Sequence, residues 1–394
     1  MERKKFLIVG LALLLIISSS VVLYLLINDE GTHYSSNKHL QLQDTFAYVY
    51  YSSSIAGEWA GDGTSHLIWI DSDGHFRTTV RSGLELNSVI PYGHQLILHK
   101  KNSAELFGDD GSLELSINDC RVHTGYGQSS GVLDNGIHYS VFNQRMGEDN
   151  YISTLRWGDA ERLYCKEFDG YVFSVGDHDS SLYIIATDIM NLKDIYLIEY
   201  QFQDVENITE HRSLLYDQNT EHLMKLTNLV WHQNKLYGVF HYNTETNILL
   251  TMAEIDLDNR TDIPFHVITS YDLDVDPMHF FFNPDSIASI DDRLLFVDGF
   301  GNVHAYDPVT HQDKVLFTFS DYARQEYWQD EKVYFSGDRL YFYYYHRDLG
   351  SHVIDTYSLD GIRENRLKIP GIFKAFGDNT VFLYDFGVIR DHPG

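Results

Sequence analysis

A short phrase recurs seven times along this 394-residue chain, and each copy has the composition of the start of a β-strand. In its clear form a polar residue precedes a hydrophobic pair, as in Lys235-Leu236-Tyr237 and Arg339-Leu340-Tyr341. The remaining copies begin at Gln95, Gly136, Ser181, Arg293 and Thr380. The second residues of consecutive copies lie 41, 45, 54, 58, 46 and 41 positions apart. A period of this length is typical of repeat architectures, and four strands per unit fit one blade of a β-propeller.

The two ends of the chain carry incomplete copies of the repeat. Few residues follow the copy at Val381, whereas residues 67–71 are suited to a later strand of a blade. We therefore expect strands from both ends to join in one blade, because closing the ring removes exposed sheet edges. Counted this way, the chain is an all-β propeller of seven blades. If residues 46–51 form an additional strand, eight blades are an alternative. If two weak copies of the phrase belong to one blade, the count is six.

Other segments refine this picture. Residues 340–345, Leu-Tyr-Phe-Tyr-Tyr-Tyr, are too rich in aromatic side chains for a sheet with one face exposed to solvent. Such a run suits an inner strand that adjacent blades cover on both faces. Residues 203–228 and 262–284 interrupt the regular spacing, so we expect either binding loops or plain insertions there.

The N-terminus predicts a membrane anchor. Residues 1–5 form a basic head, and residues 6–27 run for 22 positions without a charge, which is long enough to cross a bilayer as a helix. The basic head places the N-terminus in the cytoplasm. A cleaved signal peptide is the alternative, but apolar residues follow the candidate cleavage region 18–20 directly. We expect a tether at 28–43 and an extracytoplasmic propeller at 44–394, held at the cell membrane by a single uncleaved helix.

The charge balance bears on the choice of partner. The chain has 57 acidic and 29 basic residues, for a net charge of −28. Such a surface repels nucleic acid, so a DNA or RNA partner is not expected. It favours a protein or peptide partner that is basic.

Two sets of residues are candidates for metal binding and for a covalent cross-link. Asp272, Asp274 and Asp276 have the spacing of a calcium loop, although Pro277 stands where that loop needs glycine. We expect no cofactor, with calcium at these three aspartates as the alternative. Cys120 and Cys165 lie 45 residues apart, about one repeat. They form either a disulfide in an oxidising compartment or two unpaired buried thiols.

Motifs for catalysis are weak in this sequence. Gly127-Gln128-Ser129-Ser130-Gly131 matches the G-x-S-x-G elbow by letters. That elbow needs a strand before it and a helix after it, whereas this segment is expected to be a loop that runs into a turn, so no catalytic residue is assigned. Among the tryptophans, Trp59 in a Gly-rich stretch is the candidate for ligand binding. Trp69 and Trp157 are expected to pack between blades.

Trp69-Ile70-Asp71-Ser72-Asp73-Gly74, together with the recurrent polar-Leu-Tyr phrases, resembles bacterial extracytoplasmic β-propellers. The likeness is to the TolB-like and low-density-lipoprotein-receptor-like groups and covers roughly residues 45–390. It implies a membrane-anchored module that binds proteins, peptides or glycans. Our hypothesis is a non-enzymatic binding or scaffold module. The alternative is a hydrolase or lyase of envelope glycan with two carboxylates at the channel mouth.

Overall fold

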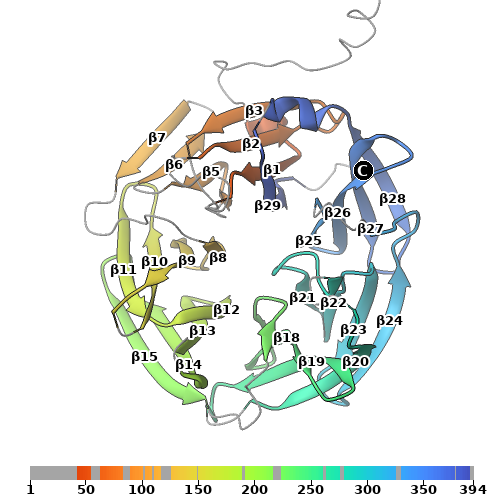
Figure 1. Cartoon of the computed structure of the whole chain (residues 1–394). Coiled ribbons are helices and arrows are strands. Elements are labelled where there is room, and N and C mark those ends of the chain that lie inside the picture. Colours follow the sequence, from red (N-terminus) through yellow and green to blue (C-terminus); the bar gives the residue numbers. More distant parts are fainter. Residues whose placement is uncertain are drawn as a thin grey trace, which may run out of the picture.

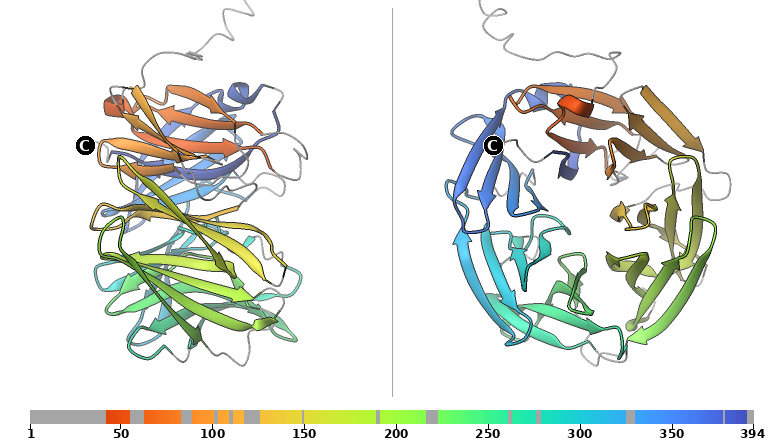
Figure 2. Two further views of the ribbon diagram at one scale, coloured as in Figure 1. Left: turned by 90° about the vertical axis from the view of Figure 1, so that its left-hand side faces the viewer. Right: turned by 180° about the vertical axis from the view of Figure 1, so that it is seen from behind.

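The strands form a closed ring of sheets (Figure 1). The computed structural model describes residues 42–54, 63–82, 89–100, 103–108, 111–116, 126–148, 150–188, 191–215, 223–260, 263–275, 279–324, 330–377 and 379–390. Within these residues there are seven antiparallel sheets arranged around one axis, as the two further views in Figure 2 also show. The expected all-β propeller of seven blades is confirmed.

Each blade runs from an innermost strand near the axis to an outermost strand at the rim. Blade 1 consists of β4 (Val89–Tyr92), β5 (Gln95–His99), β6 (Ser103–Gly108) and β7 (Gly111–Ser116). Blade 2 consists of β8 (Tyr126–Val132), β9 (His138–Met146), β10 (Tyr151–Gly158) and β11 (Leu163–Asp169). Blade 3 consists of β12 (Tyr171–His178), β13 (Ser181–Asp188), β14 (Asn191–Phe202) and β15 (Ile208–Leu215). In blade 4, β16 (Met224–Lys225) and β17 (Val230–His232) both pair with β18 (Lys235–Asn243), and β19 (Asn247–Asp256) and β20 (Phe265–Asp272) follow. Blade 5 consists of β21 (Ile287–Ile290), β22 (Arg293–Val297), β23 (Asn302–Asp307) and β24 (Gln312–Thr318). Blade 6 consists of β25 (Lys332–Ser336), β26 (Arg339–His346), β27 (Ser351–Ser358) and β28 (Arg363–Ile369). Blade 7 consists of β29 (Phe382–Val388), β1 (Ala47–Ser52), β2 (Ser65–Ile70) and β3 (Phe76–Arg81). Two short 3-10 helices, η1 (Leu42–Asp44) and η4 (Ile372–Phe376), lie outside the sheets.

The ring closes in blade 7. The C-terminal strand β29 lies innermost and pairs antiparallel with the first strand β1, with Ala47 opposite Val388 and Tyr50 opposite Asp385. The expected joining of the two chain ends in one blade is therefore confirmed. The strand expected at residues 46–51 is β1 (Ala47–Ser52) of this blade and not part of an eighth blade.

The repeated phrase marks the second strand of a blade in six of its seven copies, from β5 to β26. The copy at Thr380 differs, because it leads into β29, the innermost strand of blade 7. The second strand of that blade is β1. The seventh copy was thus a correct strand signal in a different position, on a strand that is partly buried whereas β1 is buried throughout.

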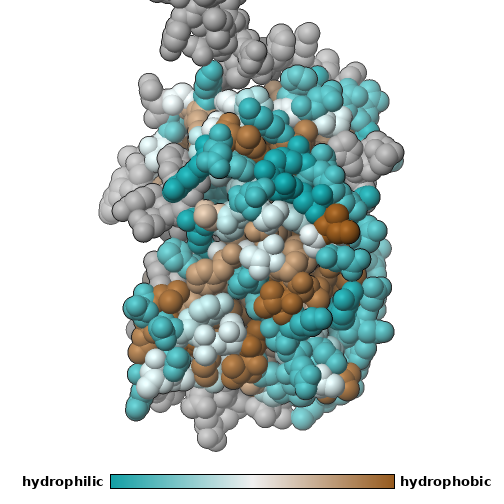
Figure 3. Space-filling model, turned by 90° about the vertical axis from the view of Figure 1, so that its right-hand side faces the viewer, coloured by the Kyte–Doolittle hydropathy of each residue, from teal (hydrophilic) through white to brown (hydrophobic). Residues whose placement is uncertain are grey.

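Burial explains why the inner strands carry this signal. All six residues of β1 and all six of β2 are buried, whereas the outermost strand β15 is mostly exposed. In β26, Tyr341 and Tyr343 pack against blade 7, while Phe342 and Tyr344 pack against blade 5. The aromatic run is covered on both faces, as expected. Polar and apolar side chains alternate over the outer side of blades 4 to 6 (Figure 3).

The two expected insertions contain regular strands. Residues 203–228 include β15, and residues 262–284 include β20. Both are outermost strands with one face in solvent, so their polar composition resembles that of a loop. The prediction of two long insertions is corrected accordingly.

Side-chain amides join one blade to the innermost strand of the next blade. Asn143 on β9 accepts from Val172 N at 2.7 Å and donates to Val172 O at 3.0 Å on β12. Asn283 makes the same pair of bonds to Val333 on β25, at 2.9 and 3.0 Å. Such contacts fix the positions of the innermost strands, which face the axis.

The predicted membrane segment cannot be placed in this fold. Residues 1–41 lie outside the described residues, and so do the predicted anchor at 6–27 and nearly all of the predicted tether. Among the described residues, no helix has the length and hydrophobicity that crossing a membrane requires. Leu42, in η1, packs in the core with Trp69.

Candidate ligand-binding site

A cavity of about 650 Å³ lies between blades 6 and 7, and we call it the blade 6–7 pocket. Its lining residues come from the end of β1, the start of β29, the helix η4 and the segment before β25. They are Tyr51, Asp330, Phe373, Phe376, Gly377, Asn379, Thr380, Val381, Phe382 and Leu383. Aromatic and aliphatic side chains form most of the wall, and Asp330 provides a carboxylate.

A buried hydrogen-bond network holds Asp330 in place. His352 Nε2 lies 3.0 Å from Asp330 Oδ2, and because a carboxylate only accepts, the ring nitrogen donates. The His352 ring stacks on Tyr343, with ring centroids 5.2 Å apart, and the Tyr343 hydroxyl lies 2.9 Å from that of Tyr51. Burial, followed by the Asp330 charge, raises the pKa of Tyr51, so this tyrosine keeps its proton. The pocket therefore combines aromatic surface with an oriented carboxylate, a combination that suits a cationic ligand group.

Beside the pocket, five ionisable side chains from five blades converge near the axis, and we call them the axial cluster. They are Asp177 on β12, Lys225 on β16, Asp285 just before β21, Lys332 on β25 and Asp385 on β29. The charge of Asp285 acts on the pKa of each of the other four. The strands β25 and β29 connect this cluster to the blade 6–7 pocket, because Lys332 follows Asp330 by two residues and Phe382 begins the strand that carries Asp385.

The Asp385 carboxyl is the most perturbed acid of the axial cluster. Burial, followed by repulsion from Asp285, raises its pKa to about 7, although Lys332 acts in the opposite direction. Its Oδ1 accepts from Phe386 N at 2.7 Å, and its Oδ2 lies 3.4 Å from Val89 N. Near neutral pH this group is therefore divided between its acid and its ionised form.

Burial also shifts the pKa of other members of the axial cluster in the direction that favours their neutral form. The pKa of Asp177 rises to about 6, first through burial and then through Asp134. The pKa of Lys225 falls to about 8 through burial, and its Nζ has no hydrogen-bond partner among the described residues. Burial also lowers the pKa of Lys332, against the pull of Asp385 and Asp285. An added cation would favour the ionised form of both acids, so the cluster is poised to respond to one.

The comparisons with known proteins agree with this fold. Residues 41–389, nearly the whole described region, match a family described as YycP, beta-propeller domain. The chain belongs to this YycP propeller family. A relative from Bacillus subtilis (strain 168), named Uncharacterized protein YycP, is 28% identical over 364 residues, which are 89% of each chain. The expected β-propeller family is thereby confirmed at the level of the fold, while the finer likeness to TolB-like and low-density-lipoprotein-receptor-like propellers stays a prediction.

Two solved structures are similar at lower identity. AztD from Citrobacter koseri has a TM-score of 0.45 and 12% identity, over 87% of this chain and 91% of that one. A puromycin-hydrolyzing peptidase of Mycobacterium tuberculosis has a TM-score of 0.49 and 12% identity, over 86% of this chain and 57% of that one. Neither likeness carries an argument about the function of this YycP-family propeller.

Of the three aspartates predicted to bind calcium, the two that the structure describes do not line the blade 6–7 pocket. Asp272 ends β20, and Asp274 is exposed in the turn that follows; Asp276 lies outside the described residues. Among the described residues, the side-chain groups able to hold a metal ion include neither Asp272 nor Asp274. The calcium site stays a prediction.

The cysteine and tryptophan predictions have mixed outcomes. Cys165 lies on β11 and is not a free cysteine, but Cys120 lies outside the described residues, so their pairing stays a prediction. Trp59 also lies outside the described residues. Trp69 and Trp157 are buried, at 2% and 7% exposure, and pack between blades as expected.

The G-x-S-x-G segment is a strand, in contrast to the expected loop. Ser129 lies on β8, the innermost strand of blade 2, and the next element is the strand β9. The helix that a nucleophile elbow requires does not follow it, so the structure gives Ser129 no catalytic setting.

The residues that form the candidate site carried a weak sequence signal. Asp385 and Asp177 are single acids within apolar innermost strands, and Lys332 follows two acids directly. A charge in a strand that is otherwise hydrophobic is the pattern that could have singled them out. Their convergence depends on the closed ring and cannot be read from any one segment.

Proposed function

We propose that this propeller is a binding module that takes a cationic segment of a protein or peptide partner into the blade 6–7 pocket. The observation that carries the proposal is a cavity of about 650 Å³ that combines the phenylalanines of η4 and β29 with the Asp330 carboxylate. A lysine or arginine side chain on such a wall gains from the aromatic faces and from the carboxylate. The axial cluster adds carboxylates beside the pocket, and the net charge of −28 steers basic partners toward the molecule.

The location of this module is part of the same proposal. The basic head and the uncharged residues 6–27 support a membrane-anchored, extracytoplasmic propeller. The partner would then be a protein or peptide outside the cytoplasm.

The test measures the binding of short labelled peptides to the full-length chain. One peptide set contains Lys and Arg, and a matched set carries Gln in their place. We expect the basic set to bind more tightly, and we expect added salt to weaken this binding, because exposed charges are screened. Asp330→Asn should weaken the binding of the basic set by about tenfold, since it removes the ionised acceptor while keeping the shape of the side chain.

A matched control distinguishes binding in the blade 6–7 pocket from general electrostatic attraction to the acidic protein. Asp360 is an exposed acid at the β27–β28 turn, so Asp360→Asn makes the same change in net charge at a distant place. Equal affinity for the basic and neutral peptides, or equal losses in the two variants, would contradict the proposal.

The glycan-cleaving alternative is favoured by one observation. Asp385, with a pKa of about 7, is affected by a second carboxyl, Asp285, and a raised acid beside a carboxylate is the chemical requirement of a glycosidase. Release of sugar reducing ends from envelope glycan, abolished by Asp385→Asn, would replace the binding proposal with this one.

A further inference from the structure

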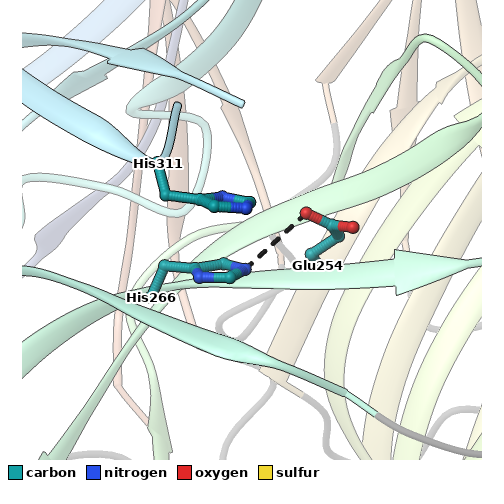
Figure 4. Close-up of side chains that lie close together, drawn as sticks. All are labelled: Glu254, His266 and His311. Carbon is teal, nitrogen blue, oxygen red and sulfur yellow. Dashed lines mark ion pairs between the residues drawn. The ribbon is translucent and has the colours of Figure 1, made fainter. Parts of the chain in front are cut away.

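Three side chains from two blades meet at the outer part of the interface between blades 4 and 5, away from the pocket and the axial cluster. They are Glu254 on β19, His266 on β20 and His311 in the turn between β23 and β24, as Figure 4 shows. One donor atom from each of the three lies within 4.8 Å of the other two. The proximity of a glutamate and two imidazoles from separate segments is the first requirement of a metal site.

The strand pairing explains why Glu254 and His266 lie together. Met252 pairs with His266 across the β19–β20 ladder, and Glu254 is two residues beyond Met252. Because side chains alternate along a strand, all three are on the same face of blade 4. Met252 packs with Tyr306 of blade 5, so this face is turned toward blade 5.

The turn of blade 5 presents His311 to that face. Asp307 Oδ1 accepts from Val309 N at 2.8 Å and from Thr310 N at 3.2 Å, which shapes the turn before the histidine. His311 has a φ of 55° and lies at the surface. Its Nδ1 is 3.0 Å from the Tyr306 hydroxyl, which leaves Nε2 as the donor atom available to an ion.

Two donor atoms of this group are buried without hydrogen bonds. Glu254 Oε2 and His266 Nε2 have no hydrogen-bond partner among the described residues, and they lie 3.7 Å apart. The Glu254 side chain is only 10% exposed. Its other oxygen, Oε1, pairs with Lys235 Nζ. The two atoms form an ion pair that is too long for a hydrogen bond (Figure 4), so a buried carboxylate oxygen and a buried imidazole nitrogen face one another with their hydrogen-bonding capacity unfilled, which points to a ligand between them.

We propose that Glu254, His266 and His311 bind one divalent transition metal ion of the zinc class. Two imidazole nitrogens and one carboxylate oxygen are the protein ligands of many open zinc sites, in which water takes the fourth position. Imidazole ligands select zinc, copper and nickel over calcium and magnesium.

The present ring geometry determines what must move when the ion binds. The His266 and His311 rings stack, with centroids 3.7 Å apart and an angle of 9° between their planes. An ion lies close to the plane of each imidazole that ligates it, so it cannot lie in two parallel planes at once. His311 is the exposed member and must turn out of the stack, while the buried Glu254 and the half-buried His266 stay in place.

The test uses Zn²⁺ and, as a spectroscopic probe, Co²⁺ with the purified full-length chain, in the presence of excess Mg²⁺ to occupy exposed acids. We expect one tightly bound Zn²⁺ per chain in competition with a coloured chelator. Bound Co²⁺ should show the visible absorption of a four-coordinate site. His311→Asn keeps a residue that tolerates the positive φ, and we expect it to weaken Zn²⁺ binding by at least about tenfold and to remove the Co²⁺ spectrum. Glu254→Gln should have the same effect while keeping the side-chain volume.

The matched control is an exposed group of similar composition. Asp71, Asp73 and His75 also lie close enough to hold an ion, but Asp71 Oδ1 already accepts from the backbone N–H groups of Asp73 and His75 at 3.0 and 2.9 Å. His75→Asn should leave the tight Zn²⁺ site unchanged. The proposal is overturned if the chain lacks a tight site, or if His311→Asn and Glu254→Gln bind Zn²⁺ as the unaltered chain does.

Discussion

At the scale of single residues, Asp385 lies in the strand Phe382-Leu383-Tyr384-Asp385-Phe386, in which it is the one charged side chain. Its backbone lies opposite Tyr50 on β1, beside a shift in the pairing register between Tyr50 and Tyr51. Burial and the nearby Asp285 raise its pKa from 3.8 to about 7. The folded state therefore binds a proton at this position over a pH range in which the unfolded chain does not.

This difference predicts how stability depends on pH. Between about pH 4 and pH 7 the folded chain holds more protons at Asp385 than the unfolded chain, so this residue makes the free energy of unfolding fall as the pH rises. Asp385→Asn carries no charge and keeps one side-chain oxygen to accept from Phe386 N, while its amide nitrogen replaces the oxygen that lies 3.4 Å from Val89 N. We expect this variant to be more stable than the unaltered chain at pH 8 by about 1–2 kcal/mol. The full shift corresponds to roughly 4 kcal/mol, but residual solvent contact and the loss of attraction to Lys332 reduce the gain.

Urea unfolding at pH 5 and pH 8 checks this expectation. The difference between the two chains should be small at pH 5 and larger at pH 8, and Asp360→Asn should show no such trend. A variant that is less stable than the unaltered chain at pH 8 would mean that the ionised Asp385 contributes favourably through Lys332.

At the scale of elements, the position of a strand within its blade determines its composition. The second strand β26 is buried on both faces, with Phe342 toward blade 5 and Tyr343 toward blade 7. The outer strand β24 has mostly half-buried and exposed residues. Phe342 in β26 therefore serves an interface between blades, whereas Val315 in β24 is 44% exposed.

Phe342→Ala measures the strength of such an interface. Phe342 is fully buried, and its ring centroid lies 4.3 Å from that of Phe319 and 5.0 Å from that of Phe282, both on the blade 5 side. Truncation should lower the free energy of unfolding by about 3–5 kcal/mol, through lost burial and the cavity that is left. Val315→Ala on β24, where the side chain is 44% exposed, should change it by no more than about 0.5 kcal/mol in denaturant titrations. If Phe342→Ala lowers the free energy of unfolding by less than about 1 kcal/mol, blades 5 and 6 move together and fill the cavity that the truncation leaves.

At the scale of the whole molecule, the closing sheet holds the ring together. Blade 7 takes β29 from the C-terminal end of the chain and β1, β2 and β3 from the N-terminal part. The core of this blade includes Val49, Tyr51, Phe386 and Val388, together with Tyr341 of blade 6. The pocket and the axial cluster both include residues of β29, so ring closure also completes the candidate site.

Removal of residues 379–394 tests the role of closure. Without β29, the edge of β1 loses its backbone partner and part of the blade 7 core becomes exposed. We expect the truncated chain to associate into oligomers by light scattering and to be cut faster by protease. Removal of residues 391–394 alone should have little effect. A monomer with an unchanged unfolding midpoint after the longer deletion would contradict this role of β29.

The blade number and the joining of the chain ends could both be predicted from the amino-acid sequence. A polar residue followed by a hydrophobic pair recurs because a strand between two neighbouring blades must be apolar on both faces, and the spacing of the phrase then counts the blades. The same logic failed for β15 and β20. These outer strands have one face in water, and their polar residues are as compatible with a loop as with a strand.

The location of the chemistry, in contrast, became visible only in the folded ring. Asp177, Asp285 and Asp385 are spread over more than 200 positions of the chain, and so are the segments that line the blade 6–7 pocket. A lone acid in an apolar strand is a weak local signal, and nothing local to it specifies a neighbour across the axis. Burial and proximity, which set the pKa of Asp385 and leave Glu254 Oε2 without a hydrogen bond, arise when seven blades close into one ring. A repeated hydrophobic pattern is local information, whereas the field at a buried charge depends on every segment that surrounds it.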